Sequence, residues 1–265
     1  MDRYFPGNSA RRATSALLGA LLASLAGPSW AVDRYGIYMG TEYTSGKYGG
    51  AASVDELYVP VSVWGDFGRM SLRLTVPWLS VDAPTGTVIV GPGGVPVIGD
   101  GPRTTESGLG DIVASGTIRD VWASRDGSLV LDLAGRVKLP TADEKKGLGT
   151  GETDFTLQAD GYRFLDGVTL MGSLGYVFRG DPDDFTLDDG VIAMLGATSS
   201  RTQGLRTGLF LEYRQAGYAT NDDRLEILGS LGWSIDQWRL GAYLLTGLSD
   251  SSPDWGAGAT VGVRY

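Results

Sequence analysis

Charged side chains recur at alternate positions within segments that are otherwise apolar. In residues 129–139, LVLDLAGRVKL, Asp132, Arg136 and Lys138 share one face of an extended chain, and most of the leucines share the other. Guanidinium, ammonium and carboxylate groups in such a row can attract ions of one sign and exclude the other. The candidate selectivity residues with this spacing are Arg73, Asp132, Arg136, Lys138, Asp154, Arg179, Arg206, Glu212, Arg214, Glu226 and Arg239.

The composition excludes most catalytic and metal chemistry. The chain has no histidine and no cysteine, so Ser–His and Asp–His mechanisms, disulfides and thiolate metal sites are unavailable. A Ser–Lys pair is formally possible, but no serine is distinguished by its neighbours. The acidic stretch 181–189, DPDDFTLDD, lacks the spacing of a calcium loop and is interpreted as a solvated loop, with a divalent-ion bridge to lipopolysaccharide as the alternative. We expect no enzyme activity, no cofactor and no resident metal.

The N-terminal segment has the features of an export signal. Arg11 and Arg12 precede the apolar run 13–27, and Ser29-Trp30-Ala31 provides a small-x-small cleavage site. We therefore expect a signal peptide over residues 1–31 and one domain over residues 32–265. The net charge of −9 argues against nucleic acid as a partner.

Alternation with period two dominates the chain after Ala31 and favours strands over helices. Twelve segments show it, and the connections between them alternate between long and short. This pattern predicts an all-β fold, a transmembrane antiparallel up-and-down β-barrel of about 12 strands. A soluble barrel or sandwich also alternates, but twelve strands with the apolar face inward would enclose a poorly filled cavity. The segments are 34–43, 54–64, 70–81, 109–121, 129–139, 153–164, 168–179, 191–198, 205–216, 224–234, 238–248 and 255–265.

Aromatic and proline residues refine this prediction. Six of the seven tryptophans follow residue 31, and all six fall near segment ends, as aromatic girdles at the two membrane interfaces require. Val261, Val263 and Tyr265 share the lipid face of the last segment. A terminal aromatic after alternating apolar residues resembles the signal read by the outer-membrane assembly machinery. Pro60 and Pro77 lie inside predicted strands, where they mark bulges or strand ends.

The longest connection, residues 82–108, is unusually apolar. Its sequences TVIV and VPVI flank GPGG and predict a small hairpin. This loop could fold over the mouth of the barrel, form an apolar vestibule, pack on a partner, or simply extend the adjoining strands. The candidate gating residues are Val88, Ile89, Val90, Val95, Val97 and Ile98.

The predicted barrel is narrow. Twelve tilted strands give a backbone radius of roughly 12–13 Å, so inward side chains leave a narrow or plugged lumen. The lumen charges then either pair across strands and brace the barrel or set ion selectivity.

Two stretches carry a family resemblance, GLGDIVASGTIRD at 108–120 and GRVKLPTADEKKGLGTGETDFTLQADGYRF at 135–164. They resemble an outer-membrane family described as MetA-pathway phenol-degradation proteins, although Ala142 replaces an expected glycine. The resemblance implies a channel or uptake protein for small, hydrophobic or aromatic compounds in the outer membrane of a Gram-negative bacterium. Its partners would be the lipid bilayer, lipopolysaccharide, the assembly machinery and a small solute. The alternatives are a narrow ion-selective porin for polar solutes and a closed structural or adhesive barrel.

Overall fold

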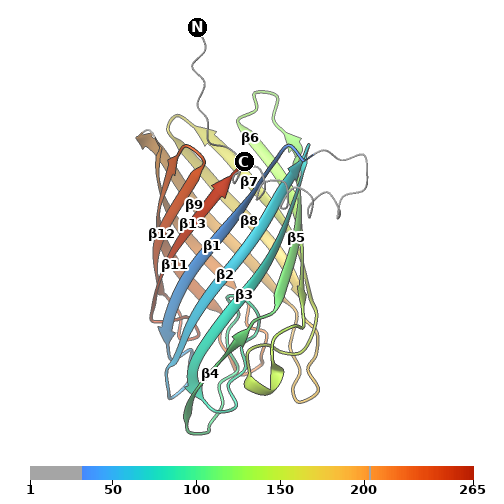
Figure 1. Cartoon of the computed structure of the whole chain (residues 1–265), viewed down its shortest axis with the longest axis vertical. Helices are drawn as coiled ribbons and strands as arrows, with labels where there is room; N and C mark the ends of the chain where they lie inside the picture. Colours follow the sequence, from blue (N-terminus) through green and yellow to red (C-terminus); the bar gives the residue numbers. More distant parts are fainter. Residues whose placement is uncertain (1–31, 203) are drawn as a thin grey trace, which may run out of the picture.

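The chain forms one antiparallel sheet that closes on itself as a barrel (Figure 1). The computed structural model describes residues 32–202 and 204–265, so the predicted signal peptide lies outside the described residues. Sequence neighbours pair around the barrel, and β1 pairs with β13 to close it. The predicted all-β transmembrane barrel is confirmed. Its strands are β1 (Arg34–Gly46), β2 (Val54–Phe67), β3 (Met70–Pro84), β4 (Arg103–Leu109), β5 (Ile112–Ala123), β6 (Leu129–Leu139), β7 (Asp154–Leu165), β8 (Val168–Phe178), β9 (Gly190–Thr202), β10 (Leu205–Arg214), β11 (Arg224–Ile235), β12 (Trp238–Gly247) and β13 (Trp255–Arg264).

Two of these strands, β4 and β5, share one position in the barrel wall. Residues 78–84 of β3 pair with β4, and residues 70–75 of β3 pair with β5. The wall therefore has the twelve positions that the sequence predicts. The prediction of a single fourth strand at 109–121 missed β4, which extends the β3 hairpin beyond the rest of the wall (Figure 1).

Two prolines explain where the pairing is interrupted. A proline has no N–H to donate to a ladder. The ladder beside β3 stops at Trp78↔Leu109 and resumes at Thr75↔Val113, so the gap lies beside Pro77. Pro60 is the direct partner of Pro77, and the β1–β2 ladder is also interrupted beside it. Residues 110 and 111 therefore lie between β4 and β5, and the Gly110 N–H donates to the Pro77 carbonyl at 3.0 Å.

The two ends of the barrel differ. Turns such as 68–69, 166–167 and 236–237 connect strands at one end, and longer loops connect them at the other. Outer-membrane barrels place short turns in the periplasm, so we name the long connections the extracellular loops. In the described part of the chain, no helix is long and apolar enough to cross a membrane.

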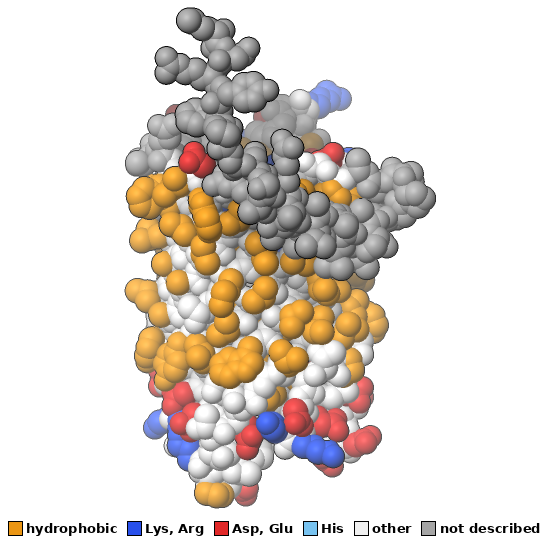
Figure 2. Space-filling view, in the orientation of Figure 1, with side chains coloured by type: hydrophobic (Ala, Val, Ile, Leu, Met, Phe, Trp, Pro, Cys, Tyr) orange, Lys and Arg blue, Asp and Glu red, His pale blue; other side chains and the backbone are white. Residues whose placement is uncertain are grey.

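The outer surface carries an apolar band. Figure 2 shows hydrophobic side chains along the height of the wall, with acidic and basic residues gathered at the loop end. Trp122, Trp233 and Trp238 are exposed toward the short-turn end, and Trp78 and Trp255 are exposed nearer the loops. These positions fit two aromatic girdles.

Trp64 is the exception to the predicted girdles. Its side chain is 9% exposed and lies on the inward face of β2, with its ring centroid 6.3 Å from that of Tyr38. Trp64 shares its parity with Ser62 and Asp66, which also face inward. Position near a strand end was therefore the wrong criterion for this residue, because parity decides which face a side chain occupies.

The seam between β1 and β13 involves the last residue. Tyr265 donates its backbone N–H to the Tyr35 carbonyl oxygen at 2.8 Å, and the Tyr35 N–H donates back at 3.2 Å. The two rings stack with centroids 5.5 Å apart. Val261 and Val263 pair with Met39 and Ile37 on the lipid side of the same seam. The seam thus gives these terminal residues a structural role, and their recognition by the assembly machinery stays a prediction.

Replacing Tyr265 with alanine should lower the thermal stability of the barrel, because it removes the stacked ring. A favourable aromatic pair contributes about 0.5–1.5 kcal/mol beyond its buried area. The measurement is the temperature at which the folded gel band of the refolded protein converts to the unfolded band. Tyr265→Phe keeps the stack and should behave like the unaltered protein. Equal transition temperatures for all three proteins would contradict a role for the ring.

Candidate functional site in the lumen

An extracellular loop folds back into the barrel. This inward loop, residues 85–102, begins at the β3–β4 hairpin, where the Thr85 N–H donates to the Pro102 carbonyl at 2.9 Å. Val88 and Val97 form a bridge with N···O distances of 2.8 and 2.9 Å. The tip, residues 91–94, is a turn closed by Gly94 N–H to Gly91 O at 3.1 Å. The predicted hairpin around GPGG is therefore present, reduced to one bridge and a turn.

The apolar side chains of the inward loop pack inside the extracellular end of the barrel. Ile89 belongs to a buried cluster with Val54, Leu79 and Leu148, and Ile98 packs against it. Val90 and Val95 are also buried. The Ile89 N–H donates to the carbonyl of Gly147 in the β6–β7 loop at 2.9 Å. These contacts anchor the loop, and the gating role of its apolar residues stays a prediction.

The tip crosses the lumen. At one side, a Cβ added to Gly91 would lie 3.3 Å from Cδ of Lys138 on β6. At the other side, Arg224 at the start of β11 donates from Nη1 to the Gly93 carbonyl at 3.0 Å. The Asn221 amide donates to the Pro96 carbonyl, also at 3.0 Å. Because β6 and β11 are five wall positions apart in a barrel of twelve, the tip spans from one wall almost to the opposite wall.

A buried ion cluster lies beside the tip. Lys138 Nζ lies 3.1 Å from Asp111 Oδ2 and 3.2 Å from Asp154 Oδ2, and it donates to Thr150 Oγ1 at 2.8 Å. The side chains of Lys138, Asp111 and Asp154 are 4%, 3% and 11% exposed. Asp111 Oδ1 accepts hydrogen bonds from the backbone N–H groups of residues 141 and 142. This brace ties the interruption at Pro77 to the β6–β7 loop, and it contains two predicted selectivity residues, Lys138 and Asp154.

Two cavities lie beside the tip. The Pro92 cavity, of about 350 Å³, is lined by Pro92, Tyr58, Arg73, Arg136, Asp160 and several hydroxyl side chains. The Gly93 cavity, of about 260 Å³, is lined by Gly93, Arg136, Glu212, Arg214, Arg224 and Glu226. Both are lined by Arg136 and Gln158, so they meet there. The structure thus brings five predicted residues, Arg73, Arg136, Glu212, Arg214 and Glu226, to the space around the tip.

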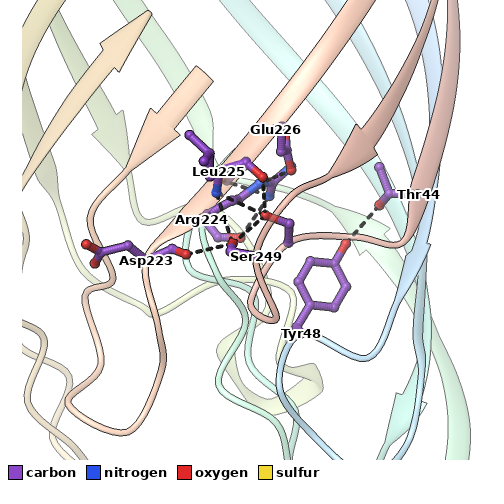
Figure 3. A network of polar contacts seen from close by, with 10 residues as sticks. Thr44, Tyr48, Asp223, Arg224, Leu225, Glu226 and Ser249 are labelled. Carbon is purple, nitrogen blue, oxygen red and sulfur yellow. Dashed lines mark hydrogen bonds and ion pairs between the residues drawn. The ribbon is translucent and has the colours of Figure 1, made fainter. Parts of the chain in front are cut away.

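Arg224 is held by protein groups. Its Nε forms an ion pair with Glu226 Oε1 (Figure 3). Its Nη1 donates to the tip. Nearby, the hydroxyl of Tyr48 in the β1–β2 loop donates to Thr44 Oγ1 at 3.3 Å (Figure 3). Burial raises the pKa of Tyr48 to about 12, so this hydroxyl keeps its proton at physiological pH.

Three other arginines are free. Within the described chain, the guanidinium groups of Arg73, Arg136 and Arg214 make no hydrogen bond or ion pair with the protein. Arg73 Cζ lies 5.9 Å from the centroid of the Tyr38 ring, a cation–π distance. These three permanently charged groups therefore keep their hydrogen-bond donors available to water or a solute.

Comparison with known proteins identifies the family of this chain. The family model described as "Putative MetA-pathway of phenol degradation" matches residues 35–265. The chain belongs to this family. The resemblance seen in residues 108–120 and 135–164 is thereby confirmed. A comparison with curated proteins gives no significant match.

Solved structures with the same fold are outer-membrane barrels. An outer membrane channel from Pseudomonas putida F1 superposes with a TM-score of 0.66 at 13% identity, covering 90% of this chain and 98% of that chain. The KdgM porin gives a TM-score of 0.51 at 10% identity, covering 87% and 98%. The translocator domain of autotransporter NalP from Neisseria meningitidis gives 0.50 at 12% identity, covering 97% and 96%. This member of the phenol-degradation family has the fold of an outer-membrane β-barrel.

Besides Lys138 and Asp154 of the brace, four predicted selectivity residues of this family member line neither cavity. Asp132 Oδ1 accepts from the backbone N–H of Asp120 at a strand irregularity. Arg239 donates to carbonyls at the β11–β12 turn, and Arg179 donates to those of residues 188 and 215 in the extracellular loops. Arg206 is exposed near the short-turn end of β10. The first three form hydrogen bonds with backbone groups.

Tyr58 and Gln158 are among the neutral residues of the site that sequence reasoning missed. Tyr58 and Gln158 line the Pro92 cavity, and Gln158 also donates to Asp160 Oδ1 at 2.6 Å. Both share the inward parity of charged neighbours on their strands, so parity without the restriction to charge would have found them. The glycines and proline of the tip could not be found this way, because no periodicity marks where a loop folds.

Proposed function

We propose that the protein is a narrow outer-membrane uptake channel for small solutes and that it prefers anions. The observation that supports this most directly is the tip of the inward loop crossing the lumen beside three free arginines. A constriction lined by one sign of charge within low-dielectric walls raises the local concentration of the opposite ion.

The residues that line the two cavities carry a net positive charge once internal pairs are set aside. Arg224 and Glu226 neutralise each other. The remaining charged lining residues are Arg73, Arg136, Arg214, Asp160 and Glu212. Three fixed positive charges thus face two carboxylates, which favours anions.

The cargo expected from the sequence, hydrophobic or aromatic compounds, needs refinement. The apolar side chains of the inward loop are engaged in packing, and the cavities are lined largely by hydroxyl and charged groups. The family description, phenol degradation, points to aromatic metabolism. Small aromatic acids, which are anions at neutral pH, satisfy both the charge of the lumen and the family description.

Replacing Arg136 with glutamate should shift ion selectivity toward cations, because it changes the fixed charge by two where the cavities meet. The measurement is the reversal potential of the refolded protein in a planar lipid bilayer under a KCl gradient. Arg136→Gln should give an intermediate value, and Arg239→Glu at the periplasmic turn should leave the reversal potential nearly unchanged. An unaltered reversal potential in Arg136→Glu would overturn the assignment. Silence from folded protein would favour a closed structural barrel.

A further inference from the structure

The Pro92 cavity has the organisation of a binding site. Its volume of about 350 Å³ is within the range of small-molecule pockets, and it is bounded on one side by the tip of the inward loop. Two free guanidinium groups, one carboxylate, one phenol ring and one amide line it, and the carboxylate, Asp160, accepts a hydrogen bond from the amide of Gln158. Hydroxyl side chains from β3, β5 and β7 also line it: Ser71, Thr75, Ser115, Thr117 and Thr156.

Strand register places the two arginines on either side of a serine. Arg73 on β3 pairs with Ser115 on β5, and Ser115 pairs with Arg136 on β6. Directly paired residues point to the same face of a sheet, with Cβ atoms roughly 4.5–5.5 Å apart. The row therefore presents guanidinium, hydroxyl and guanidinium in sequence across the wall, and the small central side chain leaves a gap between the two charges.

This row fits a carboxylate. Guanidinium groups present N–H donors in a planar fork that matches carboxylate oxygens, and a hydroxyl adds a third donor. The Arg73 and Arg136 charges are close enough to repel each other. An anion between them would relieve that repulsion.

The remaining surfaces favour a planar organic group over a bare inorganic anion. Tyr58 and Pro92 supply ring surfaces, and Val113 and Ala134 add apolar atoms. The next row toward the periplasm, Ser71 with Thr117, provides hydroxyls for polar ring substituents. An inorganic anion would use the arginines and leave these surfaces uncovered.

The Gly93 cavity is less suited to this role. One of its arginines, Arg224, is occupied by Glu226 and by the tip carbonyls. Arg214 shares the inward face of β10 with Glu212, two residues away. Two carboxylates therefore lie among its three arginines, whereas the Pro92 cavity has the single carboxylate of Asp160.

We propose that the Pro92 cavity is a binding subsite for a planar aromatic carboxylate, with the carboxylate between Arg73 and Arg136 beside Ser115 and the ring against Tyr58 and Pro92. That the subsite lies on the route of the solute rests on the proposed function. Its existence as a binding site depends only on the folded barrel.

Calorimetric titration of the folded protein in detergent with benzoate tests the subsite without requiring conduction. We expect saturable benzoate binding, at least about tenfold weaker in Arg73→Gln and in Arg136→Gln, since one lost charge-assisted contact costs about that factor. Arg206→Gln, a matched change outside the cavities, should bind as the unaltered protein does. Benzamide, the neutral isostere, should bind much more weakly. Retention of the folded gel band excludes unfolding as the cause.

The outcomes separate the two proposals. Equal benzoate affinity in Arg73→Gln and the unaltered protein, or no binding at all, would overturn the subsite. Acetate or inorganic phosphate binding as tightly as benzoate would overturn the aromatic class. Block of the chloride current by benzoate in a planar bilayer would support both proposals. Benzoate binding by a protein that carries no current, or shows no anion preference, would support the binding subsite and overturn the proposed channel function.

Discussion

Replacing residues 89–96 with Asn-Gly should raise the single-channel conductance about threefold or more, because conduction is limited by the narrowest open cross-section. Val88 and Val97 exchange both backbone hydrogen bonds, at 2.8 and 2.9 Å, so a two-residue Asn-Gly turn can close the shortened hairpin between them. The change removes the tip and its bonds to Arg224 and Asn221. The Pro92 and Gly93 cavities would then merge into one open lumen.

A matched control separates loop shortening from loss of the tip. Replacing residues 182–186 with two glycines shortens the β8–β9 loop, which does not line either cavity, and should leave the conductance unchanged. The tip variant also loses the burial of three apolar side chains, each contributing about 1.5–3 kcal/mol when fully buried, so its folded gel band must be verified. A folded tip variant with unaltered conductance would show that the inward loop does not limit conduction.

Replacing Lys138 with methionine should lower the free energy of unfolding by about 3–5 kcal/mol, the usual cost of leaving buried charge uncompensated. The substitution keeps the length of the stem but leaves Asp111 and Asp154 without their cation. Denaturant unfolding in detergent, followed by tryptophan fluorescence, measures the change.

Two further variants define the cause. Lys145→Met, in the short 3₁₀ helix Glu144–Lys146 of the β6–β7 loop, removes an exposed lysine and should change stability by no more than about 0.5 kcal/mol. Combining Lys138→Met with Asp111→Asn and Asp154→Asn removes the uncompensated carboxylate charges. The triple variant should therefore recover part of the lost free energy of unfolding. A Lys138→Met protein as stable as the Lys145→Met control would refute the brace.

The strands were predictable because a membrane barrel enforces alternation on every strand. The segment predicted at 129–139 coincides with β6, and the segment at 224–234 differs from β11 by one residue. The exception is instructive. Strand β4, RTTESGL, has no apolar face because it lies beyond the membrane-spanning wall, so no hydrophobic period reveals it.

The site was less predictable, because parity assigns a face and not a partner. Arg136 and Lys138 lie two residues apart on the same inward face, yet one lines the cavities and the other lies in the brace. What separates them is the position of Asp111, which depends on the interruption beside Pro77. The row of Arg73, Ser115 and Arg136 likewise follows from register, which a single sequence leaves open.

The contacts of the inward loop constrain the order of events during folding. The loop directly follows β3, but its partners Gly147, Asn221 and Arg224 lie much later in the sequence. Because the seam joins β1 to β13, the sheet becomes a barrel only when β13 is in place. A barrel that closed with the loop outside would have to pass it back through a mouth crowded by other loops. We therefore expect the strands to assemble around the loop. The tip would then make its contacts inside the sheet before β1 pairs with β13.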